Sequence, residues 1–472
     1  MFEFSTDPTI EVLRKDCELF RYEKMKWGSW QTARNLFLAL VGELGELSTD
    51  VAANEGFANP KDCSDSEEDE EVNVENTADN KEKDPKVETV LCELADVFSY
   101  LICLAQECQV DLAIPDSCRD SEPSSNFSDV AWNEIEVTAF YQTVRISEKT
   151  SIIKDFLSLC FSTSQLNDIF QWITVEKNLK NFSMDKQQIV DKILKKVFCH
   201  VVVIASKYEY DLPKLLKEKN AMVAEKYSKR IGILTKDDVI DSRYSDLPNF
   251  YLDADTPGQD YLLDKPVNDL KVSADKLVCK LMESIGLIAE IFQWDTDGTE
   301  TVFSPAKHAH LCNQLSMIIN VLRTLAQVHK MSFSDAFNKK MHKNRAKYPV
   351  GSGSGIFVKY NEMKGKVPNL SSGDALKSVD TYQTVSTIGG AAMAMQSFVE
   401  ERKWQKYHRH PRNLTLALFG EIGEVIELFI MKKGKTFDQC LGDELSDCVA
   451  YTVQLASCCN VDLSAAMTHY FP

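Results

Sequence analysis

The stretch RNLFLALVGELGEL, residues 34–47, decides the fold, and it returns near the other end of the chain as RNLTLALFGEIGEV, residues 412–425. Each copy is followed by a second apolar run that carries its own acids, LCELADVFSYL at 91–101 and GDELSDCVAYTV at 442–453. Leucine and alanine recur in these runs with a period near that of an α-helix, which predicts amphipathic helices. The chain is therefore expected to be all-α and to contain repeated helix pairs.

Two pairs of carboxylates stand inside each copy, and the members of a pair are three residues apart. This spacing places both side chains of a pair on one face of a helix. Like charges so close repel each other, and within apolar runs they would be costly to leave uncompensated. A bound divalent cation would remove that cost, so we predict that these acids are metal ligands. They are Glu43, Glu46, Glu93 and Asp96 in the first copy and Glu421, Glu424, Glu444 and Asp447 in the last.

The composition is that of a globular protein with an acidic surface. Hydrophobic residues make up 44% of the 472 positions, and the formal net charge is −18. Such a surface would repel nucleic-acid polymers and anionic membranes, so neither is expected as a partner, whereas a nucleotide can bind through a bridging metal. The sequence shows no leader-like start, no bilayer-spanning apolar stretch and no zinc-ligand spacing among its fourteen cysteines. We expect a cytoplasmic protein with buried thiols.

A short word recurs four times, each time after an apolar helical run, and it indicates four repeats. The copies of this landmark are CQVDLA at Cys108, YEYDLP at Tyr208, HKMSFS at His329 and CNVDLS at Cys459. We place the repeats at about residues 1–115, 128–232, 270–350 and 380–472 and expect them to pack together as a monomeric pseudo-tetramer. The acid-rich stretch at about 50–88 is expected to be a disordered insert within the first repeat.

These motifs resemble those of the MazG-type all-α nucleoside triphosphate pyrophosphohydrolases. The residues that flank them resemble the dCTP pyrophosphatase branch of that family. The words that carry the resemblance are FSTDPTIEVLR at 4–14, WQKYHRHPRNL at 404–414, AEIFQWDTDG at 289–298 and KKMHKNRAKYP at 339–349. The resemblance implies helical-bundle repeats. It also implies Mg²⁺-dependent hydrolysis between the α and β phosphates of a nucleoside triphosphate, which yields a monophosphate and pyrophosphate.

The resemblance also implies roles for individual residues. Mg²⁺ takes oxygen ligands and bridges carboxylates to phosphates, so the eight acids would hold it, with Glu46 and Glu424 as general bases on the attacking water. Glu427 would assist in the last copy or be an ordinary surface acid. Aromatic side chains would stack on the base, although core packing is the competing interpretation for each of them. The residues expected around the base are Trp27, Gln31, Tyr100, Trp404, His408 and Tyr451.

The inner repeats depart from the family pattern because they lack the acids. Ser162, Gln165, Ile193 and Lys196 stand in their places in the second repeat, and Ser284, Leu287, Gln314 and Met317 in the third. The outer repeats keep the acids but lack the word FQW and the basic tail. We therefore predict two composite sites, each joining an outer repeat to an inner one, although the sequence leaves open which repeats pair. The inner repeats would contribute Trp172 and Trp294 and, to one site, Lys340, Asn344, Arg345 and Tyr348.

The leading hypothesis is a Mg²⁺-dependent nucleotide pyrophosphohydrolase that acts on dCTP and related deoxynucleotides. The absence of the acids from two repeats suggests an alternative, a catalytically weak nucleotide-binding or structural descendant of such an enzyme. A third class is a metal-dependent phosphohydrolase of another phosphorylated substrate. Release of pyrophosphate rather than phosphate separates the first class from the third.

Overall fold

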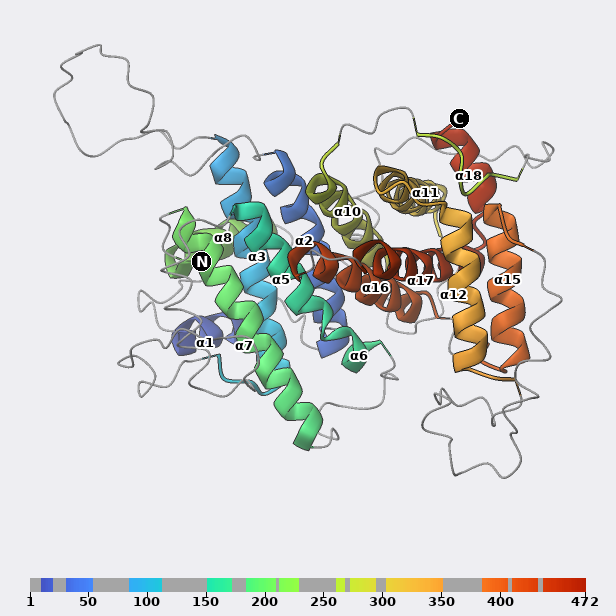
Figure 1. Cartoon of the computed structure of the whole chain (residues 1–472). Coiled ribbons are helices and arrows are strands. Elements are labelled where there is room, and N and C mark those ends of the chain that lie inside the picture. The colour runs from blue at the N-terminus through green and yellow to red at the C-terminus, as the bar shows by residue number, and fades with distance from the viewer. Residues whose placement is uncertain are drawn as a thin grey trace, which may run out of the picture. The chain divides into compact units, whose positions relative to one another are not determined.

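The computed structural model describes residues 10–19, 31–53, 85–112, 151–171, 184–208, 212–228, 260–267, 272–293, 303–350, 384–405, 410–431 and 436–472. All regular elements within these ranges are helices, and the β structure there is limited to an isolated bridge between Leu262 and Thr387 (Figure 1). The prediction of an all-α chain is therefore confirmed. Of the helices in these ranges, none combines the length and the apolar character that crossing a membrane requires.

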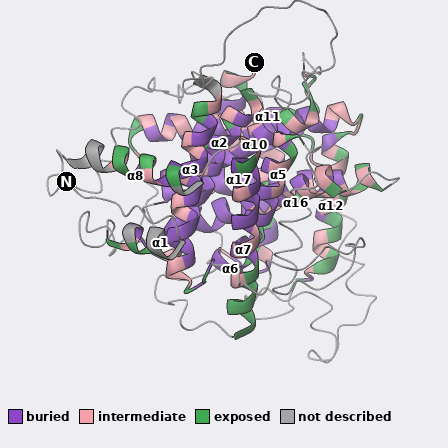
Figure 2. Cartoon of the chain, turned by 90° about the vertical axis from the view of Figure 1, so that its left-hand side faces the viewer, coloured by how far each residue is buried: buried purple, intermediate pink, exposed green. Residues whose placement is uncertain are grey.

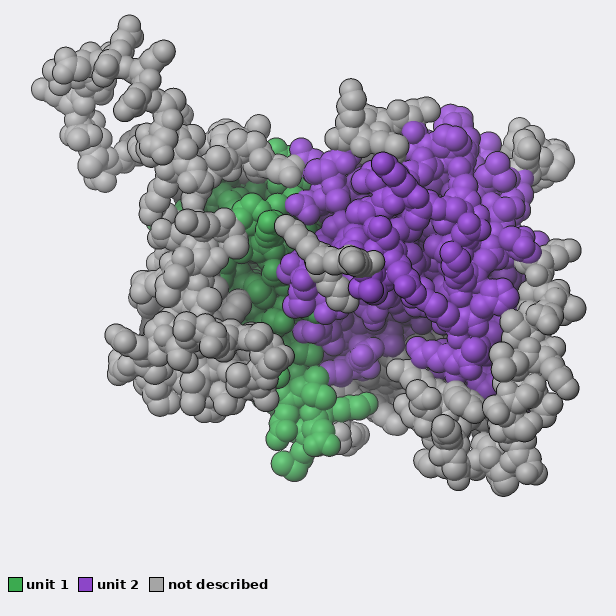
Figure 3. Space-filling model, in the orientation of Figure 1, with its two compact units in different colours: residues 1–163, 178–234 green, residues 164–177, 235–472 purple. Residues whose placement is uncertain are grey.

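The chain divides into two compact units, which Figure 3 shows in different colours. Unit 1 comprises residues 1–163 and 178–234, and unit 2 comprises residues 164–177 and 235–472. The helices of unit 1 are α1 (Ile10–Leu19), α2 (Ala33–Ala53), α3 (Pro85–Glu107), α5 (Ile152–Ser164, except its last residue), α7 (Met184–Lys207) and α8 (Leu212–Ser228). Those of unit 2 are α6 (Asn167–Phe170), α10 (Ala274–Phe292), α11 (Pro305–Val328), α12 (Phe333–Lys347), α15 (Ile388–Glu401), α16 (Pro411–Met431), α17 (Phe437–Cys458) and α18 (Leu463–Tyr470).

Within unit 1, the two acid-bearing helices α2 and α3 pack against each other, and α3 also packs against α1, α7 and α8. The ring of Phe98 in α3 stacks on Phe198 in α7, with 5.8 Å between the ring centroids. Buried residues, purple in Figure 2, run along these helices. Helices from the first and second predicted repeats therefore share one core.

Unit 2 shows the same pattern of contacts. The acid-bearing helices α16 and α17 pack against each other, and α17 also packs against α11, α12 and α15. α10 packs on both α11 and α16, and α18 packs on α11. Phe333 and Phe337 of α12 and Phe419 of α16 are fully buried. Helices from the third and fourth predicted repeats thus share a second core.

The landmark closes a helix, and its three described copies have one backbone geometry. The second residue of each copy has a positive φ: 57° for Gln109, 54° for Lys330 and 56° for Asn460. The next residue donates its N–H to the carbonyl five positions back, for example Val461 to Ala456 at 2.8 Å, which closes the helix end as a Schellman motif does. Ser332 and Asp462 then cap the following helix. The recurrence of the word reflects this turn.

The helices on either side of the acid-rich stretch extend a few residues into its predicted limits of about 50–88. α2 continues to Ala53, because Ser48 and Val51 still pack in the core. α3 begins at Pro85, and proline is well suited to the first turn of a helix because it has no N–H to satisfy. Residues 54–84 lie outside the described residues.

Candidate metal centre and substrate site

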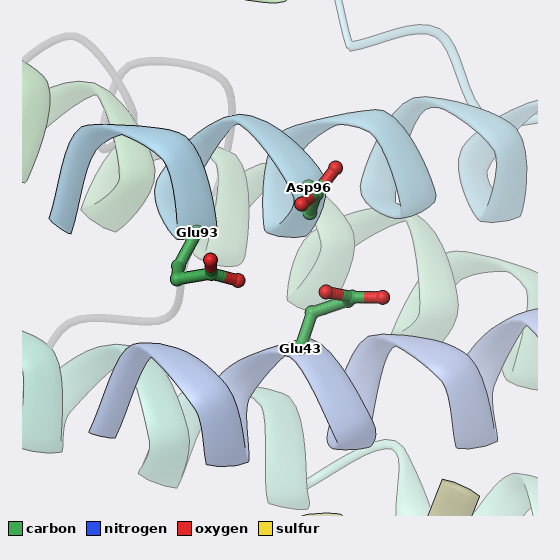
Figure 4. A group of neighbouring side chains, drawn as sticks. All are labelled: Glu43, Glu93 and Asp96. Carbon is green, nitrogen blue, oxygen red and sulfur yellow. The ribbon is translucent and has the colours of Figure 1, made fainter. Parts of the chain in front are cut away.

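Unit 1 brings three of its predicted ligands together. Glu43 comes from α2, and Glu93 and Asp96 come from one face of α3. One carboxylate oxygen of each lies within 4.8 Å of the others, and all three side chains are half-buried. Figure 4 shows Glu43 directed from α2 towards the two acids of α3. Glu46 is exposed, one turn further along α2, and lies within hydrogen-bonding reach of Glu93.

Unit 2 builds a matching cluster from α16 and α17. Glu421, Glu444 and Asp447 are half-buried, and one oxygen of each again lies within 4.8 Å of the others. Glu424 is exposed on α16 and lies within hydrogen-bonding reach of Glu444, as Glu46 does of Glu93. Glu427 is half-buried on the same helix. The two units therefore present the same arrangement of three converging acids with a fourth at the rim.

The clusters are electrostatically costly when all the acids are ionised. Burial, followed by the hydrogen bond and the charge of Glu46, raises the pKa of Glu93 to about 8. The pKa of Glu444 also rises to about 8, chiefly through burial, although Lys340 opposes the rise. Burial and the charge of Asp447 raise the pKa of Glu421 well above its usual range. Repulsion of this kind is relieved by a cation or by a proton.

The donor atoms suit a hard cation. Each cluster offers carboxylate oxygens only, which is the ligand set that Mg²⁺ prefers. In unit 1 the Oε2 atom of Glu93 is buried and accepts no hydrogen bond from the described residues. A buried carboxylate oxygen without a hydrogen-bond donor destabilises the folded state unless a cation or a proton approaches it. The residues present therefore fit a magnesium ion held by three carboxylates.

A lysine from the neighbouring predicted repeat approaches the last acid of each cluster. In unit 2, Lys340 of α12 forms an ion pair with Asp447, and Asn344 donates a hydrogen bond from Nδ2 to Oδ1 of Asp447 at 3.4 Å. In unit 1, Lys219 of α8 pairs with Asp96 at 2.5 Å. Burial lowers the pKa of Lys340, but the charge and hydrogen bond of Asp447, together with the charges of Glu444 and Glu421, outweigh it and raise that pKa to about 12. Both lysines are therefore held as cations beside the acids.

Lys219 is a site residue that the sequence reasoning missed. The landmark contains the signal that identifies it: Lys219 stands eight positions after Asp211 of YEYDLP, and Lys340 stands eight positions after Ser332 of HKMSFS. The second repeat therefore keeps the first residue of the basic tail. Aligning the landmarks across the inner repeats would have found it.

Three aromatic residues of the predicted substrate site lie together in unit 2: Trp404 and Tyr451, expected near the base, and Tyr348 of the basic tail. The ring of Tyr348 meets that of Trp404 edge-on, with 5.2 Å between centroids, and Trp404 is buried. Arg402 fixes this junction by donating a hydrogen bond from Nε to the carbonyl of Tyr348 at 2.6 Å. Burial, then the charges of Glu421 and Asp447, raises the pKa of Tyr451, so its hydroxyl lies close to the cluster. Residues from the third and fourth predicted repeats thus meet here.

Some of the other predicted site residues have a described position and degree of burial, and the rest lie outside the described ranges. Tyr100 is half-buried on α3, Arg345 is half-buried on α12, and Gln31 is buried shortly before α2. In FQW, the first residues Phe170 and Phe292 are buried as core side chains. The residues that lie outside the described ranges are Trp27, His408, Trp172 and Trp294.

A segment of the second predicted repeat supports the acid helix α16, which sequence reasoning also missed. α6 packs against α16 within unit 2. A Cβ atom at Gly423 would collide with the side chain of Ser164, and one at Gly420 would collide with that of Asn167. The glycines on either side of Glu421 therefore permit a close approach that positions this helix.

No protein-family model matches the chain, and no solved structure matches it. Among curated proteins, human dCTP pyrophosphatase 1 is 46% identical to the chain over 79 residues, which are 15% of this chain and 46% of the human protein. Bovine dCTP pyrophosphatase 1 is 43% identical over 96 residues, which are 18% of this chain and 56% of the bovine protein. The chain thus spans about half the length of the curated relatives it matches. It contains a region similar to dCTP pyrophosphatases.

Proposed function

We propose that the chain is a Mg²⁺-dependent nucleoside triphosphate pyrophosphohydrolase that acts on dCTP and related deoxynucleotides. The observation that carries the proposal is the convergence of three carboxylates from two packed helices in each unit. The likeness to dCTP pyrophosphatase 1 supports the choice of substrate. The half-buried rings of Tyr348 and Tyr451 lie near the acids, and a nucleobase stacks on aromatic rings of this kind.

The residues divide the chemistry between them. Glu43, Glu93 and Asp96 hold the metal in unit 1, and Glu421, Glu444 and Asp447 hold it in unit 2. A bound Mg²⁺ would offset the charge of the substrate phosphates. Glu46 and Glu424, exposed at the rims, accept a proton from the attacking water. The water oxygen bonds to the α phosphorus, the bond from that phosphorus to the bridging oxygen breaks, and pyrophosphate leaves. Lys340 adds positive charge beside the phosphates.

The test is a panel of deoxynucleoside and nucleoside triphosphates with Mg²⁺, scored for pyrophosphate and for phosphate. We expect dCTP to give dCMP and pyrophosphate. The double variant Glu43→Gln with Glu421→Gln keeps the side-chain shapes and removes one ligand charge per cluster, so its turnover should fall at least about a hundred-fold. The matched control is Glu88→Gln with Glu400→Gln, two exposed acids outside the clusters, and its turnover should not change. Phosphate as the sole product, or full turnover in the double variant, contradicts the proposal.

The ion pairs of Lys219 and Lys340 favour a second candidate, a nucleotide-binding descendant without useful catalysis. In each unit an ammonium already offsets the charge of one predicted ligand. Such a protein would bind a deoxynucleoside triphosphate and return it intact. The same panel separates the two candidates, because binding without pyrophosphate release identifies the second.

A further inference from the structure

The two clusters have the same acids but different surroundings on the helix that carries the lysine. Aligned on Lys219 and Lys340, three consecutive positions change from polar to apolar residues. In α12 of unit 2 they are Lys343, Asn344 and Arg345; in α8 of unit 1 they are Met222, Val223 and Ala224. These positions lie three to five residues after the lysine, which is about one helical turn, so some of them share the face of the helix that carries the lysine.

The polar residues at these positions of α12 make contacts that methionine, valine and alanine at the aligned positions of α8 cannot reproduce. Nζ of Lys343 lies 2.6 Å and 2.8 Å from the two carboxylate oxygens of Asp443. Asn344 donates to the cluster acid Asp447. In unit 1, Cys92 takes the place of Asp443 next to the cluster acid Glu93, and Met222 is 57% exposed. The two units therefore differ in the type of residue at these positions, polar in unit 2 and apolar in unit 1.

This difference bears on turnover more than on binding. Both units keep three carboxylates and one lysine, which are enough to hold a metal and the phosphates it bridges. Cleavage in addition places negative charge on the departing pyrophosphate, and donors arranged for that charge stabilise the transition state. In unit 2 the amide of Asn344 donates to Asp447 in the cluster, and Arg345 is the next residue of α12. At the aligned positions of α8 stand valine and alanine, residue types without a side-chain donor.

We propose that the cluster of unit 1 is a binding site for a magnesium–nucleoside triphosphate complex with little turnover, and that hydrolysis takes place in unit 2. The inference rests on the proposed function, because it assigns different tasks to two sites of the same family. It makes the chain an enzyme that carries a second, non-hydrolytic nucleotide site.

The test combines turnover with a binding count, using the full chain and a dCTP analogue whose α–β bridging oxygen is replaced by methylene. The wild type should bind two equivalents of the analogue with Mg²⁺. Glu421→Gln should bind one, and Glu43→Gln with Glu421→Gln should bind none. Turnover of Glu421→Gln should fall at least about a hundred-fold, the range for loss of preorganised transition-state stabilisation, whereas two equal sites would leave about half of it. Unchanged thermal melting shows that the variants fold.

Grafting the polar residues of α12 onto α8 tests whether they are the cause of the difference in turnover. Adding Val223→Asn and Ala224→Arg to Glu421→Gln should raise turnover several-fold, whereas the control Ala221→Arg, at an exposed position of α8, should not. The inference is overturned if Glu421→Gln keeps about half the turnover, if it binds no analogue, or if the graft gains nothing. A wild type that binds two equivalents but releases no pyrophosphate would instead overturn the proposed function, so the two failures are distinguishable.

Discussion

At the scale of single residues, the carboxyl groups of each cluster cannot all be ionised without a compensating positive charge. Glu93 and Glu444 have pKa values raised to about 8 mainly by burial, with neighbouring acids adding to the rise. Below that value the folded, metal-free protein keeps a proton on each group, whereas an unfolded chain would have lost it near its ordinary pKa of 4.5. Metal binding requires the ionised form, so metal and proton compete for these oxygens.

This competition predicts proton release when Mg²⁺ binds. At about pH 7 the release should approach one proton from Glu93 and one from Glu444, and Glu421, whose pKa is also raised, should add to it in unit 2. At about pH 9 the contributions of Glu93 and Glu444 should become small, because both groups are then already ionised. Isothermal titration calorimetry in two buffers with different ionisation enthalpies measures the released protons. The variant Glu93→Gln with Glu444→Gln is the control, since it has no proton to lose at these positions. Equal heats in both buffers at neutral pH would contradict the prediction.

The residue scale also shows what a single sequence can and cannot predict. A spacing of three within an apolar run singled out all six acids that converge. Helix geometry places the two acids of α3, and likewise the two of α17, on one face, and the packing of α2 on α3 and of α16 on α17 adds Glu43 and Glu421. Lys219 escaped notice because an isolated lysine on a lysine-rich helix has no local signature. Its meaning depends on Asp96, which lies far away in the sequence and close in space. Whether the acids bind a metal stays a prediction.

At the scale of helices, the position of α16 depends on two glycines. Gly423→Ala should destabilise the protein, because the new methyl group collides with Ser164 and overpacking of this kind costs about 1–3 kcal/mol. The higher helix propensity of alanine returns about 1 kcal/mol, so a net loss of up to about 2 kcal/mol is expected. Urea unfolding measures it. Displacement of Glu421 and Glu424 on the same helix should also weaken Mg²⁺ binding.

Two further variants isolate the cause. Gly442→Ala in α17 is the matched control, because a Cβ atom there would lie 3.3 Å from the Cβ of Ala336 and needs only a small adjustment. Its stability should change little or rise slightly. Ser164→Gly combined with Gly423→Ala removes the colliding side chain, so the pair should be more stable than the sum of the single changes predicts. Equal losses for Gly423→Ala and Gly442→Ala would show that the contact with Ser164 is unimportant.

Helix boundaries followed from the sequence where capping chemistry is local. The landmark predicted the end of each apolar helix, and the structure adds that the second residue of its three described copies adopts the left-handed conformation. The extent of α2 was harder to predict, because its last turn precedes acid-rich sequence. Val51 keeps that turn helical by burying its side chain against the rest of the unit, a tertiary contact that local composition does not reveal.

At the scale of the whole chain, the sequence predicted composite sites but not which repeats form them. The pairing is decided by how the apolar faces of long helices fit together, and several leucine-rich faces in this chain look alike as sequence. In unit 1, α3 is covered by α7 and α8 of the second predicted repeat, and in unit 2, α17 is covered by α11 and α12 of the third. The lysines follow from that pairing, because α8 and α12 carry them to the acids.

This pairing leads to a prediction about the oligomeric state. A lone acidic repeat would expose the apolar face of its second acid helix and would need a partner chain to cover it. Here another part of the same chain already covers that face in each unit, and the covering helix brings the lysine to the acids. The 472-residue chain should therefore be a monomer in solution. Light scattering coupled to size-exclusion chromatography should give the mass of one chain, and specific activity should be constant on dilution. A dimer or tetramer that loses activity as it dissociates would show that the sites need a second chain, contrary to the pairing seen within each unit.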